Sequence, residues 1–251
     1  LEVRQFFLQA KLPNRWQEEI IEEYKKVGRG KVAVRSSATC EDLEGASFAG
    51  QQDTYLNIFG DKQLLEAVKK CLASLFTVRA IVYRNNKKIE HDKAALSLVV
   101  QQMIDPLVSG VSFSVDPLSG FEGGIRIDAS YGLGEAIVQG MVSPDTFLVT
   151  KKDVIIIQKE MGAKEKMVVY VPQGGTKVLT TPKEKLDQWC VTEKTVLEIA
   201  VIVGKIEHFY GHLVDVEFAI DQQNQLWILQ VRPETKWQEI KKLNSNLIPF
   251  S

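Results

Sequence analysis

The fold is decided by the stretch from Val214 to Val231, which reads VDVEFAIDQQNQLWILQV. Apolar and polar residues alternate before the polar segment 222–225 and a largely apolar run follows it, a pattern typical of two antiparallel strands joined by a turn. A four-residue loop over that segment fixes which residues face one another. The predicted pairs on the apolar face are Ile220 with Trp227, Phe218 with Leu229 and Val216 with Val231. We expect this face to pack into the core, with Phe218 and Trp227 buried.

The opposite face of the same predicted hairpin is polar. It pairs Glu217 with Gln230 and Asp215 with Arg232, at the spacing of roughly 5 Å between Cβ atoms that cross-strand neighbours have. Carboxylate and amide oxygens beside a guanidinium suit Mg²⁺ that carries a nucleotide phosphate. The alternative is a polar face that is merely solvated, as in many antiparallel sheets.

A second segment with the chemistry of a phosphate site begins at Val32 and reads VAVRSSATCEDLEGASFAGQQDTYLNI. The short strand at its start leads into Arg35 and two serines, and glycines follow. A guanidinium, hydroxyls and closely approaching backbone N–H groups are what a polyphosphate needs. The sequence has no GxxxxGK[ST] motif, so a P-loop is excluded and another architecture must bind the phosphate.

Length and charge narrow the class of protein. The 251 residues are 45% hydrophobic and 25% charged, which fits one large globular domain or two small ones, and the net charge of −1 favours neither nucleic acid nor membrane as a partner. Three scattered cysteines indicate neither a disulfide framework nor a zinc site, so a cytoplasmic location is expected. Because the chain begins at Leu1, we expect it to be a fragment whose first lobe is incomplete.

The remaining periodicities predict a mixed α and β protein. The predicted helices are 12–27, 61–83, which should be the longest, and 192–210. The predicted strands are 32–34, 95–103, 111–115, 125–130, 146–150, 154–157, 167–171, 214–220 and 226–231. The lysines of the segment 164–166 are expected in a solvated turn.

Four motifs in this order resemble the nucleotide-binding domain of the phosphoenolpyruvate synthase and pyruvate phosphate dikinase family, of which rifamycin phosphotransferase is a close relative. The motifs are RSSATCEDLEGASFAGQQDTYLNI (35–58), SGVSFSVDPLSG (109–120), IDASYGLGEAIVQGMVSPDTF (127–147) and VDVEFAI with LWILQVRPET (214–235). The resemblance implies an α+β ATP-grasp fold, in which two lobes hold ATP and Mg²⁺ between them. It divides the chain into part of an N-terminal lobe (1–94), a C-terminal lobe (95–235) and a linker (236–251) toward a phosphohistidine domain.

The resemblance also implies roles for individual residues. Arg35 and Arg232 correspond to the two arginines that contact the transferring phosphoryl group, and Glu217 and Gln230 correspond to the metal ligands. Four further residues are implied in nucleotide binding: Gly50 and Thr54 in a closing loop, Gln101 at the adenine-side hinge, and Asp215 as a supporting partner of Arg232 or a ribose contact. We expect Arg35 to reach the cleft onto which Glu217 and Gln230 open.

In this family the β-phosphoryl group of ATP passes to a histidine on a swivelling domain and then to pyruvate or another acceptor. The family's N-terminal glycine- and lysine-bearing motif, its phosphohistidine segment and its pyruvate-binding barrel have no counterpart in the sequence, so the chain alone is not expected to complete the reaction. The alternatives are a rifamycin phosphotransferase type of enzyme and a non-catalytic nucleotide-binding module.

Overall fold

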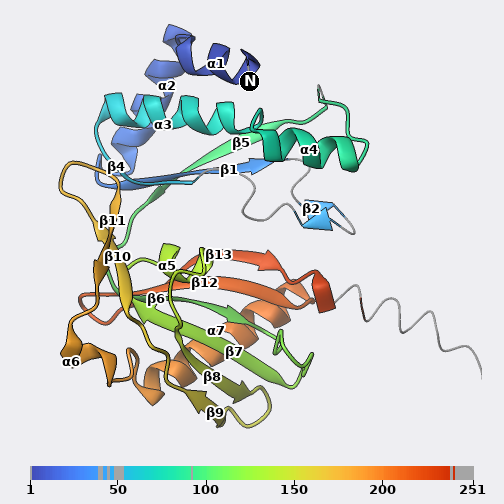
Figure 1. Ribbon diagram of the computed structural model, residues 1–251, viewed down its shortest axis with the longest axis vertical. Helices are drawn as coiled ribbons and strands as arrows, with labels where there is room; N and C mark the ends of the chain where they lie inside the picture. Colours follow the sequence, from blue (N-terminus) through green and yellow to red (C-terminus); the bar gives the residue numbers. More distant parts are fainter. Residues whose placement is uncertain are drawn as a thin grey trace, which may run out of the picture. The chain divides into compact units, whose positions relative to one another are not determined.

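The computed structural model describes residues 2–38, 42–43, 46–47, 54–91, 93–237 and 240, which fold into two compact units (Figure 1). The first unit comprises Leu1–Met103 and Tyr170–Thr176, and the second comprises Ile104–Val169 and Lys177–Ser251. The predicted nucleotide residue Gly50 and all of the predicted linker except Lys236, Trp237 and Ile240 lie outside the described residues. Both units combine helices and sheets, so the expected α+β class is confirmed.

The first unit is built on a three-stranded antiparallel sheet of order β4-β1-β5. Its elements are α1 (Glu2–Gln9), α2 (Asn14–Lys26), β1 (Val32–Ala38), β2 (Asp42–Leu43), β3 (Ala46–Ser47), β4 (Tyr55–Ile58), α3 (Asp61–Ser74), α4 (Val78–Asn86) and β5 (Leu96–Gln102). Helix α3 covers one face of the sheet (Figure 1), where Val32 and Val34 are buried together with Leu64 and Val68. Because side chains alternate along a strand, Arg35 lies on the opposite face.

The boundary between the units differs from the prediction. Strand β5 was assigned to the C-terminal lobe, which was expected to begin at residue 95, but all seven residues of β5 pair with β1. The same pairing extends β1 beyond Val34 to Ala38. This ladder joins residues 58 to 70 positions apart, which local periodicity cannot reveal. The first unit therefore runs to Met103.

The long helix predicted over 61–83 is two helices. Helix α3 ends at Ser74, and Thr77 adopts an extended conformation with φ −69° and ψ 153° before α4 begins. The Thr77 side chain accepts a hydrogen bond from the backbone N–H of Ala80 at 3.2 Å, so it caps the N-terminus of α4. The longest helix among the described residues is instead α7 (Glu193–Tyr210), with 18 residues.

The chain returns to the first unit at Tyr170–Thr176, where Asn57 holds it. Asn57 is fully buried in the left-handed region with φ 55°, and its Nδ2 donates to the carbonyls of Val171 and Gly175, both at 2.7 Å. The backbone N–H of Gly175 donates in turn to the carbonyl of Asn57 at 3.1 Å. These bonds connect the turn to β4 through backbone carbonyls and an N–H group rather than through a regular strand ladder.

The second unit is a six-stranded antiparallel sheet of order β13-β12-β6-β7-β8-β9, with α7 across one face (Figure 1). Its strands are β6 (Pro106–Phe113), β7 (Gly124–Tyr131), β8 (Asp145–Thr150), β9 (Ile156–Glu160), β12 (Val214–Asp221) and β13 (Leu226–Pro233). Beside this sheet lie α5 (Glu135–Val138), α6 (Lys183–Leu186) and the hairpin of β10 (Lys166–Tyr170) with β11 (Thr176–Thr180).

The core of the second unit lies between the sheet and α7. Helix α7 begins after Thr192, whose side chain caps it, and ends at Gly211 with φ 71°. Its buried residues Val196, Ile199 and Val203 pack with alternate residues of the strands. Val216 and Phe218 of β12 belong to this core, as predicted. The other face of β12 carries the polar residues.

The predicted pairing of the β12–β13 hairpin is correct at its open end and wrong near its turn. Asp215 lies opposite Arg232 and Glu217 opposite Gln230, whereas Phe218 faces Ile228 rather than Leu229. The loop is one residue shorter than expected: Asp221 closes it by backbone bonds with Asn224 and Gln225, and Asn224 takes the left-handed conformation with φ 60°. A β-bulge that adds Leu229 to β13 compensates for the short loop.

Two predictions of burial are wrong for related reasons. The bulge pairs Trp227 with Ala219, which places it on the face opposite Phe218, where it is 42% exposed and its Nε1 donates to Asp221 at 2.8 Å. Lys164 was expected in a solvated turn but is fully buried and forms an ion pair with Asp145. For Trp227 the shifted register overrides the local pattern, and for Lys164 the distant partner Asp145 does.

Among the described residues, no helix combines the length and apolar character needed to cross a membrane.

Candidate functional site

The polar face of the β12–β13 hairpin brings four predicted site residues together. Nη2 of Arg232 lies 3.0 Å from Oδ2 of Asp215 and 3.6 Å from Oε1 of Glu217. Gln230 is the direct cross-strand neighbour of Glu217. Two carboxylates, an amide and a guanidinium thus occupy two adjacent rows on the sheet face that α7 does not cover.

The site is only partly accessible to solvent, which strengthens its electrostatics. The side chains of Asp215, Glu217 and Arg232 are 17%, 15% and 26% exposed. Burial raises the pKa of Asp215, the charge of Arg232 opposes this effect, and the neighbouring Glu217 adds to it. The Oδ1 atom of Asp215 is buried without a hydrogen-bond partner among the described residues. A buried acceptor of this kind carries a desolvation cost that a bound cation or donor would relieve.

The donor set fits Mg²⁺ held jointly by protein and phosphate. Within the described part of the chain there is no group of three or more His, Cys, Asp or Glu residues that could hold a metal by itself. Mg²⁺ sites that carry phosphate commonly use only one or two carboxylates, and phosphate oxygens and water complete the coordination. Glu217 with the amide oxygen of Gln230 would supply hard oxygen ligands of that type.

In the first unit, the structure joins two further predicted residues. Nη1 of Arg35 donates to Oε1 of Gln101 at 3.3 Å, on the sheet face opposite α3. Thr54 is exposed just before β4. That Arg35 shares a cleft with Glu217 stays a prediction, as do the roles of Thr54 and Gly50.

A second charged cluster on the same face of the six-stranded sheet was not predicted. Nε of Arg126 lies 3.2 Å from each carboxylate oxygen of Asp128, and Thr146 donates to Asp128 at 2.8 Å. Asp116 lies 3.7 Å from Nη1 of Arg126. Burial acts to raise the pKa of Asp116, but hydrogen bonds from Ser119 and Leu118 outweigh it and lower the pKa. The alternation Arg–Ile–Asp in β7 was the signal that could have revealed this cluster.

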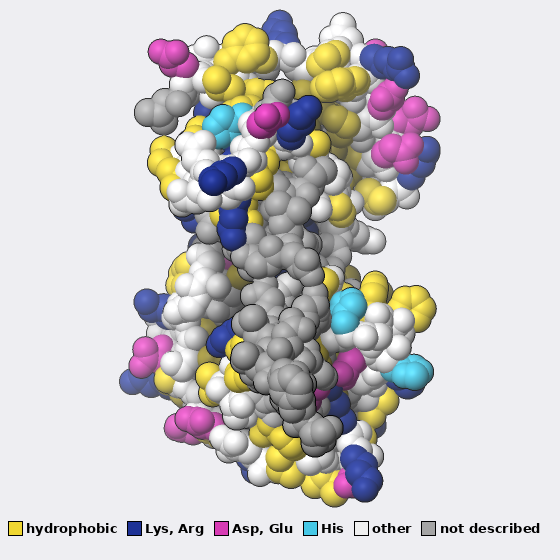
Figure 2. Space-filling view, turned by 90° about the vertical axis from the view of Figure 1, so that its right-hand side faces the viewer, with side chains coloured by type: hydrophobic (Ala, Val, Ile, Leu, Met, Phe, Trp, Pro, Cys, Tyr) yellow, Lys and Arg dark blue, Asp and Glu magenta, His cyan; other side chains and the backbone are white. Residues whose placement is uncertain are grey.

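Charges elsewhere on the surface are mixed. Figure 2 shows basic and acidic side chains interspersed over the visible, described part of one face. The net charge of −1 agrees with this distribution.

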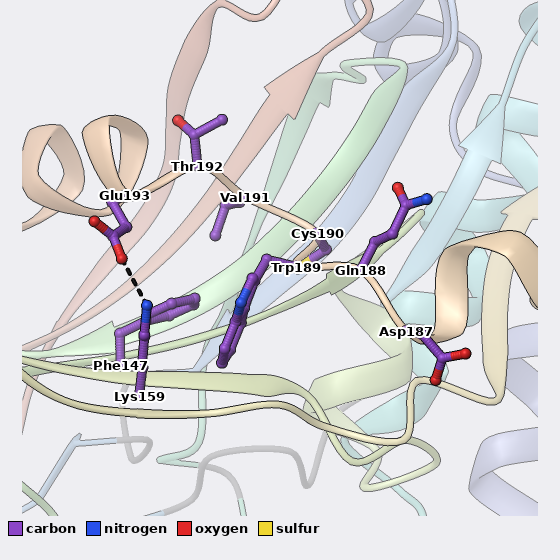
Figure 3. A pocket seen from close by; sticks show the side chains of 9 residues that line it. All are labelled: Phe147, Lys159, Asp187, Gln188, Trp189, Cys190, Val191, Thr192 and Glu193. Carbon is purple, nitrogen blue, oxygen red and sulfur yellow. Dashed lines mark hydrogen bonds and ion pairs between the residues drawn. The ribbon is translucent and has the colours of Figure 1, made fainter.

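A concavity of about 490 Å³ lies at the start of α7 and is separate from these clusters (Figure 3). Lys159 crosses it, forming a 2.7 Å ion pair with Glu193 and lying 5.6 Å from the centre of the Trp189 ring. Cys190 also lines it, and burial, together with the charge of Asp145, raises the pKa of the thiol. A thiol that stays protonated is a poor nucleophile, so this concavity has no reactive group of that kind.

The two units therefore define a class of protein: an α+β domain pair in which one sheet is covered by α3 and carries Arg35 on its other face, and the other is covered by α7 and carries the charged residues of β12 and β13 on its other face. Residues 1–247 match the family model described as pyruvate phosphate dikinase, AMP/ATP-binding domain, and the chain belongs to that family. The expected resemblance is confirmed.

The chain is similar to several larger proteins. It is 42% identical over 96% of its length to a probable phosphoenolpyruvate synthase of Methanocaldococcus jannaschii, and 36% identical over 96% of its length to the phosphoenolpyruvate synthase of Aeropyrum pernix. An uncharacterized phosphotransferase of Bacillus subtilis is 44% identical over 84% of the chain. The chain spans 21%, 33% and 25% of these three proteins respectively.

Among solved structures, D-alanyl-alanine synthetase A of Vibrio cholerae matches 88% of the chain and 47% of its own length, with 12% identity and a TM-score of 0.35.

Proposed function

We propose that this chain binds Mg²⁺-ATP as the nucleotide domain of a phosphoenolpyruvate-synthase-like phosphotransferase, with the two units acting as the lobes of an ATP-grasp fold. The observation that carries the proposal is the cluster of Asp215, Glu217, Gln230 and Arg232 on one face of β12 and β13. Membership of the AMP/ATP-binding family supports it.

In this proposal the residues act chiefly by positioning and by charge. Glu217 and Gln230 hold the metal, which when bound neutralises charge on phosphate oxygens. Arg232 is fixed by Asp215 at 3.0 Å, so its guanidinium is oriented before the nucleotide arrives. Arg35, held by Gln101, contacts a second part of the polyphosphate. Charge neutralisation by preorganised donors is the main source of catalysis in phosphoryl transfer.

The complete reaction extends beyond the chain. We propose that the β-phosphoryl group passes to a histidine on a separate domain as its bond to the α-phosphate breaks and AMP leaves, that a water molecule takes the γ-phosphoryl group as inorganic phosphate, and that pyruvate is the final acceptor. The phosphohistidine and pyruvate-binding domains would then be the partners of this chain, and a cytoplasmic location follows from the metabolic nature of the substrates. Three relatives named as synthases or phosphotransferases support this assignment.

Titration of the chain with ATP at several Mg²⁺ concentrations tests the binding step. We expect ATP affinity to rise with Mg²⁺ and to fall when Arg232 is replaced by Met, which keeps much of the side-chain volume without the charge. Lys236→Met, a change of basic residue on the same segment, is the control and should bind ATP like the wild type. An ATP affinity that depends neither on Mg²⁺ nor on Arg232 would refute the proposed site.

A further inference from the structure

The strand pairing places Gln101 beside the phosphate-binding candidate Arg35. Gln101 is the cross-strand partner of Ala33, and Arg35 is the next residue of β1 whose side chain lies on that face. Diagonal neighbours of this kind are roughly 7–8 Å apart, within reach of long side chains. Ala33 has only a methyl group, so the Gln101 side chain can lean along the strand and accept the 3.3 Å hydrogen bond from Nη1 of Arg35.

The residue directly opposite Arg35 cannot do this. It is Val99, which has no hydrogen-bonding side chain. The hydrogen bond to the Arg35 guanidinium therefore comes from Gln101, the diagonal neighbour on β5, and not from the residue directly opposite Arg35. An arginine has many rotamers, and a donor that is oriented in advance loses less entropy when it binds a phosphate.

From this geometry we infer that Gln101 is a positioning residue that orients Arg35 toward the polyphosphate, and that it does not read the adenine base. The inference rests on the proposed nucleotide site and changes the role that the family resemblance implied for Gln101. The ribose separates the base of ATP from its phosphates, so a side chain hydrogen-bonded to the phosphate arginine is placed for the phosphate end.

A double-mutant cycle of Gln101→Leu and Arg35→Ala separates the two roles. If Gln101 acts through Arg35, Gln101→Leu weakens Mg²⁺-ATP binding roughly three- to tenfold, the effect of one hydrogen bond, and leaves the ratio of ATP to GTP affinity unchanged. In the Arg35→Ala background the same substitution then has no further effect. A changed ATP to GTP ratio, or additive losses, would overturn the inference in favour of direct base contact.

The exposed neighbour Gln102 provides a matched control, because it pairs with Val32 and its side chain lies on the other face. Gln102→Leu removes the same amide from the same strand and should leave Mg²⁺-ATP affinity at the wild-type value. A loss equal to that of Gln101→Leu would show a general effect on β5 and contradict the inference.

A measurement without nucleotide distinguishes failure of this inference from failure of the proposed function. The Nε–Hε group of Arg35 gives an NMR signal whose heteronuclear NOE reports its mobility. Gln101→Leu should lower this NOE, and Gln101→Glu, which keeps an acceptor oxygen, should restore it. An unchanged NOE in Gln101→Leu overturns the inference that Gln101 orients Arg35, even if the wild type binds Mg²⁺-ATP. A wild type that binds no nucleotide but shows the NOE change overturns the proposed function, and with it the phosphate role of Gln101.

Discussion

Asp215 and Arg232 lie directly opposite each other on β12 and β13, with Nη2 of Arg232 3.0 Å from Oδ2 of Asp215. The other oxygen of the same carboxylate, Oδ1, is buried without a hydrogen-bond partner among the described residues. One side chain thus fixes a guanidinium and presents an unsatisfied acceptor. This arrangement costs stability in the absence of a ligand, and such costs are typical of binding sites.

The first prediction concerns the metal. Glu217→Gln removes the charge of a proposed ligand but keeps its shape, so Mg²⁺-dependent ATP affinity should fall roughly tenfold or more, the effect of losing a charged contact. Calorimetric titration with and without Mg²⁺ measures the change. The cooperative thermal transition should persist. Glu160→Gln, on the exposed strand β9 of the same sheet, should bind like the wild type, and equal losses in both variants would argue against a metal role for Glu217.

The second prediction concerns pH. Because the pKa of Asp215 is raised in the folded protein, chiefly by burial, its contribution to stability is full below the pKa of an unfolded Asp, about 3.9, and is lost as the pH rises through the raised pKa. Asp215→Asn cannot ionise, so it should gain stability relative to the wild type between pH 4 and pH 7. Urea unfolding at both pH values measures this difference.

The control for this pH dependence is Asp221, whose pKa is lowered, chiefly by the hydrogen bond from Trp227. Its stabilising contribution is present above about pH 3.9 and is lost as the pH falls through the lowered pKa. Asp221→Asn should therefore lose stability relative to the wild type as the pH rises toward about 3.9 and should change little further between pH 4 and pH 7. A relative gain of Asp221→Asn equal to that of Asp215→Asn between pH 4 and pH 7 would contradict the proposed environment of Asp215.

The third prediction concerns the buried ion pair of Lys164 and Asp145. Asp145 also accepts hydrogen bonds from the backbone N–H groups of Gly162 and Cys190, at 2.9 and 2.8 Å. Lys164→Met leaves this carboxylate buried without its counter-charge and should lower the free energy of unfolding by about 3–5 kcal/mol. Lys166→Met, two residues along the chain at an exposed position, should change it by less than about 0.5 kcal/mol. Chemical denaturation measures the free energy of unfolding of both variants. Equal values for the two would show that the Lys164–Asp145 ion pair does not stabilise the fold.

The fourth prediction concerns the short hairpin loop. Asn224 has φ 60°, a conformation that disfavours β-branched residues. Asn224→Val should destabilise the protein by about 1–2 kcal/mol, whereas Asn224→Gly should be close to neutral. Gln223→Val tests whether β-branching alone matters in this loop. Thermal unfolding should give Asn224→Val the lowest melting temperature of the three variants. An Asn224→Val variant as stable as the wild type would contradict the left-handed geometry.

The sequence alone determined the contents of the candidate site in the second unit. Alternation along β12, with the register set by an assumed four-residue loop, placed Asp215 opposite Arg232 and Glu217 opposite Gln230, because exchanging the two faces would bury charges and expose Val216 and Phe218. The same alternation would have indicated Arg126 and Asp128, had it been applied to β7. Local periodicity and the cost of burying charge are enough for such predictions, since both act within one or two neighbouring strands.

Only the tertiary structure decided the rest. The pairing of β5 with β1 assigned Gln101 to the first unit and brought it to Arg35, although the two residues are 66 positions apart. The bulge at Leu229 preserved the site pairing despite a shorter loop, and the partner Asp145 allowed Lys164 to be buried. The physical reason is common to these cases: each depends on a contact between distant segments or on a local irregularity, and the free energy of such contacts is absent from the periodicity of either segment alone.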